Sequence, residues 1–73
     1  MTHHDFNRLA QALGITRAEL CRRIGISPNS GTAYGLGRKE IPQPIALACH
    51  AVMLDLRPAD HAIISAHFAE GRE

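Results

Sequence analysis

The residues whose chemistry stands out lie in one segment, between positions 16 and 39. Its centre carries amide and hydroxyl side chains, with Asn29, Ser30 and Thr32 following a Ser-Pro pair. An amide can contact N6 and N7 of adenine together, and a threonine can donate to a base acceptor or place its methyl group on thymine. Flanking cations are suited to phosphate; they are Arg17, Arg22, Arg23, Arg38 and Lys39. These residue types suit contacts with nucleic acid, and the elements that position them decide between that role and an ordinary solvated surface.

The histidines, cysteines and carboxylates form no catalytic or metal-binding pattern. His61 and His67 are six residues apart and share no helical face, whereas Cys49 and His50 are adjacent, so their side chains diverge. No acidic pair, Ser/His/Asp set or glycine-rich phosphate loop occurs in a pocket-forming context. Cys21 and Cys49 each lack a neighbouring cysteine, which is typical of buried thiols in a reducing cytosol. We expect no enzyme activity, cofactor, metal or small-molecule ligand.

Length and charge narrow the class of protein. The 73 residues allow one domain with a small core, and the net charge is only +1. Residues 1–40, however, carry six of the eight Lys and Arg residues but three of the seven Asp and Glu residues. A basic front half suits a protein that presents one face to a polyanion, although an ordinary solvated surface has the same pattern. With no membrane-length apolar run and no signal peptide, we expect a cytoplasmic protein.

Glycine and proline divide the chain into five short predicted helices, and the scarcity of β-branched and aromatic residues disfavours a sheet. The first helix carries an apolar stripe: Phe6, Leu9, Ala10 and Leu13. We expect His4 or Asp5 to cap it and Gly14 to end it. The second helix follows a predicted capping box, in which Thr16 accepts from the amide of Glu19 and the Glu19 carboxylate returns to the backbone of Thr16.

Only Gly25–Ser27 separates the second helix from the third, which requires a tight and nearly perpendicular turn. Ser27 is the expected N-cap of the third helix and Pro28 its first residue, with the end near Leu36, at Gly37. Cys21 falls where the two helices cross, so a small residue is needed there. Three larger side chains are expected to face inward: Leu20, Ile24 and Tyr34.

The fourth and fifth helices are strongly apolar. Pro44 is expected to open the fourth, which should be largely buried because its apolar residues cover most of its circumference; they are Ile45, Leu47, Ala48, Val52 and Leu54. The fifth is predicted from Pro58 to Gly71 and has two apolar stripes. The first consists of Ala59, Ala62, Ile63 and Ala66, and the second of Ile64 and Phe68. A monomer can bury one stripe, and the second needs a partner.

The run ALGITRAELCRRIGISPNSGTAYGLGRKEIPQPIALA resembles the Cro and lambda-repressor-like (XRE) family of helix-turn-helix regulators. The likeness covers roughly residues 5–56 and combines a capped second helix, a G-I-S-P turn, a late aromatic in the third helix, a G-x-x-x-I-P-x-P loop and an alanine-rich fourth helix. It implies one five-helix, all-α domain over residues 1–73, with the helix-turn-helix at about 16–37. The third helix would enter the major groove, and helices four and five would supply core and dimer contacts.

The resemblance also implies roles for individual residues. Base contacts are assigned to Asn29, Ser30, Thr32 and Ala33. Phosphate contacts are assigned to Thr16, Arg17, Arg22, Ser27, Tyr34, Arg38 and Lys39. The homodimer contact on the fifth helix is assigned to Ile64 and Phe68, with His61 or His67 at its rim.

Several of these side chains have a structural alternative. Asn29 can instead bond backbone amides at the helix start, and Ser30 can be solvated. Arg17 can touch phosphate, brace a base-reading residue or remain an exposed first-turn arginine. Tyr34 fits the core better than a contact surface, although its hydroxyl could reach a backbone oxygen. Since Arg22 and Arg23 are adjacent on a helix, only one of them is expected to face DNA.

The chain departs from the family pattern in two ways. Gly31 stands where a Val or Ile usually joins the third helix to the second, and Gly35 adds another helix-interior glycine. Each costs about 1 kcal/mol of helix propensity relative to alanine, so we expect a soft third helix that orders fully on DNA. That helix also lacks Arg, Lys and Gln.

Together these features predict a sequence-specific, double-stranded-DNA-binding transcriptional regulator of the bacterial cytosol and nucleoid. It would be a repressor or autorepressor that binds an inverted-repeat operator as a homodimer. Similar compact regulators occur in phages and mobile elements, including regulators that accompany anti-CRISPR genes. Two alternatives remain at this point: an antitoxin or adaptor that binds protein first and DNA second, and a small metal-dependent enzyme.

Overall fold

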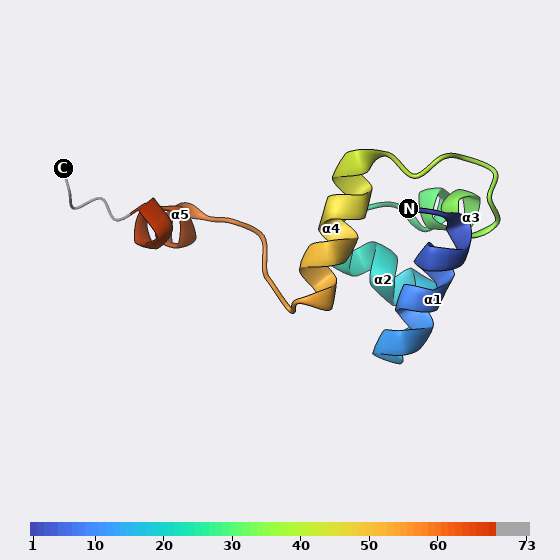
Figure 1. Ribbon diagram of the computed structural model, residues 1–73, viewed down its shortest axis with the longest axis horizontal. Helices are drawn as coiled ribbons and strands as arrows, with labels where there is room; N and C mark the ends of the chain where they lie inside the picture. Colours follow the sequence, from blue (N-terminus) through green and yellow to red (C-terminus); the bar gives the residue numbers. More distant parts are fainter. Residues whose placement is uncertain (69–73) are drawn as a thin grey trace.

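The computed structural model describes residues 1–68, which form five α-helices and contain no strand (Figure 1). The helices are α1 (His3–Leu13), α2 (Arg17–Ile24), α3 (Pro28–Gly35), α4 (Gln43–Met53) and α5 (His61–Phe68). The all-α class and the five helices are therefore confirmed. None of the helices in residues 1–68 has the length and apolar character needed to cross a membrane. Helices α1–α4 pack together, whereas α5 stands apart (Figure 1).

The start of α1 lies earlier than predicted. Thr2, and not His4 or Asp5, is the N-cap: its hydroxyl accepts from the Asp5 amide at 3.1 Å, and the Asp5 carboxylate accepts from the Thr2 amide at 3.1 Å. Hydrogen bonding to the carboxylate by the Thr2 backbone and, after it, by the Thr2 side chain lowers the pKa of the Asp5 carboxyl below its ordinary value. The prediction was wrong because Thr2 and Asp5 together make a complete capping box, which neither His4 nor Asp5 could form alone.

The ends of α1 and α2 and the start of α3 are confirmed. Gly14 and Gly25 adopt the left-handed conformation, with φ of 69° and 79°, and the Ser27 hydroxyl accepts from the Ser30 amide at 3.2 Å. The predicted capping box of α2 is only half present. Thr16 accepts from the Glu19 amide at 3.0 Å, but the Glu19 carboxylate binds two arginines instead of the Thr16 backbone.

The core lies between α1, α2, α3 and α4. At the centre of the core the rings of Phe6 and Tyr34 meet edge to face, with their centroids 6.0 Å apart. The buried residues of this core are Phe6, Leu9, Ala10, Leu20, Tyr34 and Cys49. Partly buried side chains pack around them: Leu13, Ile15, Ile24, Ile26, Ile41, Ile45 and Val52. The inward orientation predicted for Leu20, Ile24 and Tyr34 is confirmed.

Helix α4 is much more exposed than predicted. It begins at Gln43, with Pro42 as its N-cap and Pro44 in its first turn. Only Cys49 is buried, whereas Leu47 and Met53 are 61% and 58% exposed. The prediction was wrong because α4 packs on one side only, against α1 and α2, so apolar residues on its other faces have no cover.

Helix α5 also differs from its prediction. It begins at His61 because the Asp60 carboxylate accepts from the Ile63 amide at 2.9 Å, and Pro58 precedes the helix. Its predicted end, Gly71, lies outside the described residues. The helix packs against none of α1–α4 and has no buried residue, so the expectation that a monomer buries one apolar stripe was wrong.

The Phe6 ring should be the largest single contributor to the stability of the α1–α4 core. We predict that Phe6→Ala lowers the free energy of unfolding by about 3–5 kcal/mol, because it removes a fully buried aromatic ring and leaves a cavity. Urea unfolding followed by far-ultraviolet circular dichroism measures the change. The control Leu47→Ala removes an exposed side chain and should stay within about 0.5 kcal/mol of the wild type. Equal losses in both variants would contradict the assignment of the core.

Candidate nucleic-acid interface

The short connection between α2 and α3 is held by backbone and side-chain contacts at each of its residues. Gly25 reverses the chain at the end of α2, and the Ile26 amide donates to the Cys21 carbonyl at 3.0 Å. The Ile26 side chain packs on the core, and Ser27 caps α3. The orientation of α3 relative to α2 is therefore fixed by local hydrogen bonds as well as by packing.

Helices α2 and α3 meet at Cys21 and Gly31. Both residues are buried, and a Cβ placed on Gly31 would overlap with the Cys21 sulfur. The thiol thus fills the space that a side chain at position 31 would occupy. Burial in apolar surroundings raises the pKa of the Cys21 thiol, and it raises that of Cys49 as well. Both cysteines are free, so they act as small apolar groups, as predicted.

Gly35 gives the second close contact along α3. A Cβ there would lie 2.7 Å from Arg17 Nε and 2.9 Å from Asn7 Oδ1, and Asn7 Nδ2 donates to the Gly35 carbonyl at 2.8 Å. Gly31 lies beside the aliphatic part of the same arginine, since a Cβ there would be 3.9 Å from Arg17 Cγ. Half-buried Arg17 therefore lies along the two glycines and braces α3, and it is not a freely exposed first-turn residue.

The outward face of α3 carries most of the predicted base-contact residues. Asn29 and Thr32 are exposed, and Ser30 and Ala33 are half-buried. The Asn29 amide makes no hydrogen bond to any residue in the described part of the chain, because Ser27 already caps the helix. Sequence reasoning missed Leu36, which is exposed and lies seven residues after Asn29 on the same face; the i, i+7 spacing was the available signal.

The two serines at the start of α3 are not equivalent. Ser27 Oγ donates its only hydroxyl proton to Ser30 Oγ at 3.1 Å while it accepts from the Ser30 amide. The hydroxyl proton of Ser30 consequently remains available to an external acceptor, whereas that of Ser27 is used. Thr16 differs from Ser27 in this respect, since its hydroxyl is exposed and only accepts, from the Glu19 amide.

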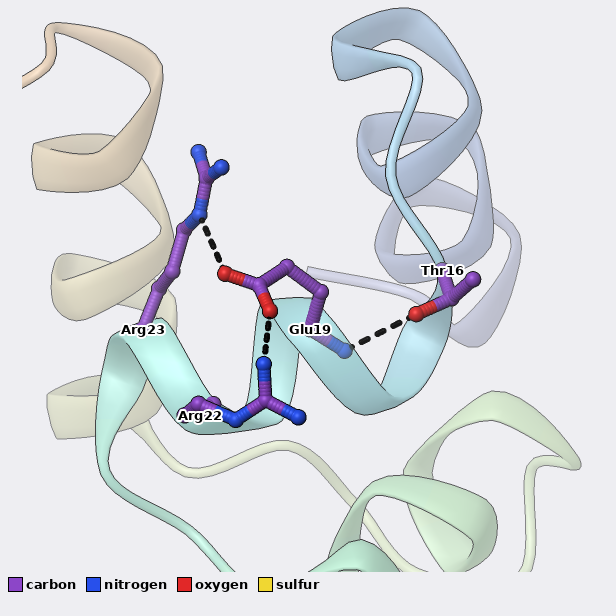
Figure 2. Close-up of polar contacts among 4 residues, drawn as sticks. All are labelled: Thr16, Glu19, Arg22 and Arg23. Atoms are coloured by element: carbon purple, nitrogen blue, oxygen red, sulfur yellow. Dashed lines mark hydrogen bonds and ion pairs between the residues drawn. The ribbon is translucent and has the colours of Figure 1, made fainter.

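Glu19 holds both arginines at the end of α2. Figure 2 shows its carboxylate between the two guanidinium groups, with Oε1 bonded to Arg22 and Oε2 at 3.1 Å from Arg23 Nε. Arg23 lies on the α4 side of α2 (Figure 2), and the Arg22 side chain is the more exposed of the two. Arg22 is therefore the more accessible to an external phosphate, although one carboxylate partly neutralises each.

The loop after α3 carries two exposed cations, Arg38 and Lys39. The Arg38 amide donates to the Ala33 carbonyl at 2.8 Å, so this residue is anchored to the end of α3. Lys39 Nζ lies 5.9 Å from the centre of the Tyr34 ring. Tyr34 itself is buried against Phe6, and its hydroxyl bonds no described residue. The ring is therefore a core element that also supports a cation at the surface.

The predicted dimer residues lie together on α5, away from the other helices (Figure 1). Ile64 is 49% exposed. His61 Nε2 and Ser65 Oγ are 3.3 Å apart, and the rings of His67 and Phe68 meet edge to face.

Within residues 1–68, no group of three His, Cys, Asp or Glu side chains is arranged to hold a metal ion. Comparisons with family models, with curated proteins and with solved structures gave no match to this chain.

The contact between Cys21 and Gly31 can be tested by exchanging its atoms. We predict that Gly31→Ala lowers the free energy of unfolding by about 1–2 kcal/mol, because overpacking exceeds the roughly 1 kcal/mol gained in helix propensity. In a Cys21→Ala background the same change should instead stabilise by up to about 1 kcal/mol, since the new Cβ would lie 3.7 Å from Cβ of residue 21.

Urea unfolding of the wild type, the two single variants and the double variant measures this coupling. Thr32→Ala, on the outward face of the same helix, is the control and should change the free energy of unfolding by nearly the same amount in both backgrounds. An identical effect of Gly31→Ala with and without the thiol would show that the two helices do not meet as described.

Proposed function

We propose that this chain is a sequence-specific double-stranded-DNA-binding protein that places α3 in the major groove. The observation that carries the proposal is the Asn29 amide. It lies in the first turn of a helix, where asparagine ordinarily bonds the backbone, yet it has no partner among residues 1–68 and points to solvent. An unbonded amide on an outward helix face can donate to and accept from the Hoogsteen edge of adenine.

Thr32 and Ala33 complete the proposed base-contacting surface. They lie three and four residues after Asn29, so they share its face of α3, and each offers a methyl group to thymine. Ser30 retains a hydroxyl proton for a base or phosphate oxygen. The surface carries no charge, and its readout would therefore rest on hydrogen bonds and methyl contacts.

The affinity for DNA would come from cations around α3. Arg38 and Lys39 follow its end, Arg22 lies on α2, and Thr16 offers a hydroxyl at the start of α2. Such groups would bind phosphate and fix the register of α3 in the groove. Arg17 has another part in this proposal: it braces α3 through Gly35 and reaches phosphate only at its exposed edge.

The packing of α1–α4 and the tight α2–α3 connection support a helix-turn-helix of the Cro and lambda-repressor-like type. We extend the proposal to a homodimeric repressor or autorepressor in the cytosol, encoded by a phage or mobile element, including one associated with anti-CRISPR genes. Its two α3 helices would contact half-sites of an inverted repeat about one helical turn apart. In this proposal the protein needs no cofactor and catalyses no reaction.

Selection of bound sites from a random DNA pool tests the proposal directly. We predict an enriched inverted repeat, and an affinity for that site that falls steeply with salt. If about eight phosphates are neutralised per dimer, the slope of log affinity against log salt is about −7. Fluorescence anisotropy with the selected duplex at several salt concentrations measures the slope. The absence of any enriched sequence would refute specific binding.

Two substitutions separate base readout from phosphate binding. We predict that Asn29→Ala relaxes the preference at one base position of each half-site, at a cost of about 1–3 kcal/mol per half-site. Arg38→Ala should weaken all sequences alike and reduce the salt slope by about 2, because each copy of the dimer loses one phosphate contact. Arg8→Ala, which removes an exposed arginine from α1, is the matched control and should change neither quantity. If Asn29→Ala and Arg38→Ala act identically, the assigned roles are wrong.

A protein-interaction module, such as an antitoxin or adaptor with secondary DNA binding, is the second candidate. The specific observation in its favour is that α3 carries no charged side chain and that its outward face ends on the exposed Leu36. A salt slope near zero in the same titration would favour this function over the first.

A further inference from the structure

Exposed apolar side chains concentrate in the last third of the described chain. Of the large hydrophobic residues that are exposed, all but Met1 and Leu36 lie between positions 47 and 68. They are Leu47, Met53, Leu54, Leu56, Ile64 and Phe68. These residues occur on α4, on the segment 54–60 and on α5. Since α5 contacts none of the other helices, two apolar surfaces of one chain remain apart.

The surface formed by α4 and residues 54–60 contains a groove of about 340 Å³. The end of α2 supplies Arg23 and Ile24 to it. Helix α4 supplies Ala48, Ala51 and Val52, and the following segment supplies Leu56, Arg57, Pro58 and Ala59. The floor is formed by small and branched apolar side chains, whereas the two arginines stand at the rim. An apolar helix would fit this shape better than an extended polar peptide.

The wall formed by residues 56–59 is attached to the end of α4. Asp55 takes a left-handed conformation with φ of 57°, which reverses the chain. Its amide donates to the Val52 carbonyl at 3.0 Å, and the Leu56 amide donates to the Ala51 carbonyl at 2.9 Å. The segment then runs back beside α4 and leaves the body toward α5 (Figure 1). The connection to α5 is thus itself part of the groove.

This geometry directs α5 away from its own groove. Only Asp60 separates the wall residue Ala59 from the first residue of α5, so the helix cannot turn into a groove that its own connection lines without breaking that wall. An isolated helix of eight residues is also marginal in water and requires a packing partner. The groove of a second copy is not lined by the connection of the incoming helix. It can therefore receive α5 without disruption and give it a packing partner.

We propose that two copies of this chain exchange their α5 helices, each α5 lying in the groove of the other copy between α2, α4 and residues 56–59. Ile63 and Ile64 would enter the apolar floor. The Asp60 carboxylate at the start of the incoming helix would lie near Arg57 at the rim, a cation that forms no ion pair within residues 1–68. Exchange of an identical element is a low-cost route to a symmetric dimer.

This inference rests on the homodimer of the proposed function and specifies how the two copies bind each other. It differs from a direct contact between two α5 helices. Its test contains no DNA, so failure of the exchange and failure of DNA binding are separate results. Sedimentation equilibrium of the full chain should give a dimer. The variants Leu56→Glu, in the groove wall, and Ile64→Glu, on α5, should each raise the dimer dissociation constant at least tenfold. Both residues are exposed, so circular dichroism should show an unchanged fold.

Mixing the two variants is the decisive step. One of the two contacts in the mixed dimer contains neither substitution, so the mixture should associate at least tenfold more tightly than either variant alone. Both substitutions add a negative charge, and attraction between opposite charges therefore cannot produce this rescue. Leu47→Glu is the matched control on an exposed part of α4 that does not line the groove, and it should dimerise like the wild type.

Three results would overturn the exchange. A monomeric wild type would show that nothing from a second copy fills the groove. Normal dimerisation of Leu56→Glu would show that α5 meets another α5 and not the groove. Mixing without rescue would show that the two substituted positions do not belong to one contact.

Discussion

The arrangement of the whole candidate interface depends on one close contact, that between the Cys21 sulfur and Gly31. At this point Gly31 has no side chain, and the Cys21 thiol alone fills the space between α2 and α3. Arg17 extends the contact along α3 to Gly35, where Asn7 of α1 bonds the backbone carbonyl. Two helices, α1 and α2, therefore hold the inward face of α3. Its outward face, with Asn29 and Thr32, is fixed by contacts that those two residues do not make.

Packing against α1 and α2 gives both glycines of α3 a structural role. By propensity alone, Gly31 and Gly35 weaken α3 by about 1 kcal/mol each. In the structure both are buried and both provide room, one for a thiol and one for a guanidinium. The loss in helix propensity is offset by packing that a larger residue would prevent. If α3 binds DNA as proposed, this close support has a clear use, because a few weak base contacts discriminate well only when their positions are fixed.

Local signals predicted local structure well. Gly14, Gly25 and Ser27 mark helix ends through their own backbone or hydroxyl group, and all three act as expected. Errors arose where groups compete. Glu19 was expected to complete a capping box, but two guanidinium groups one turn away attract its carboxylate more strongly than a neutral amide does. The positions of Arg17 and Gly35 could not be predicted at all, because they depend on how α1, α2 and α3 meet in space.

The outcome for α4 and α5 has a different physical origin. An apolar residue pattern indicates that a helix face is more stable when it is buried than when it is exposed to water. It does not specify which element buries that face. We predicted that the rest of the monomer buries α4. For α5 we predicted that the monomer buries one apolar stripe and a partner buries the other. The structure leaves both largely open because Asp55 and residues 56–59 direct the chain out of the groove that they form. A chain reversal at a single left-handed residue thus keeps two apolar surfaces of one chain apart, and in the proposed exchange a second copy supplies the missing contact.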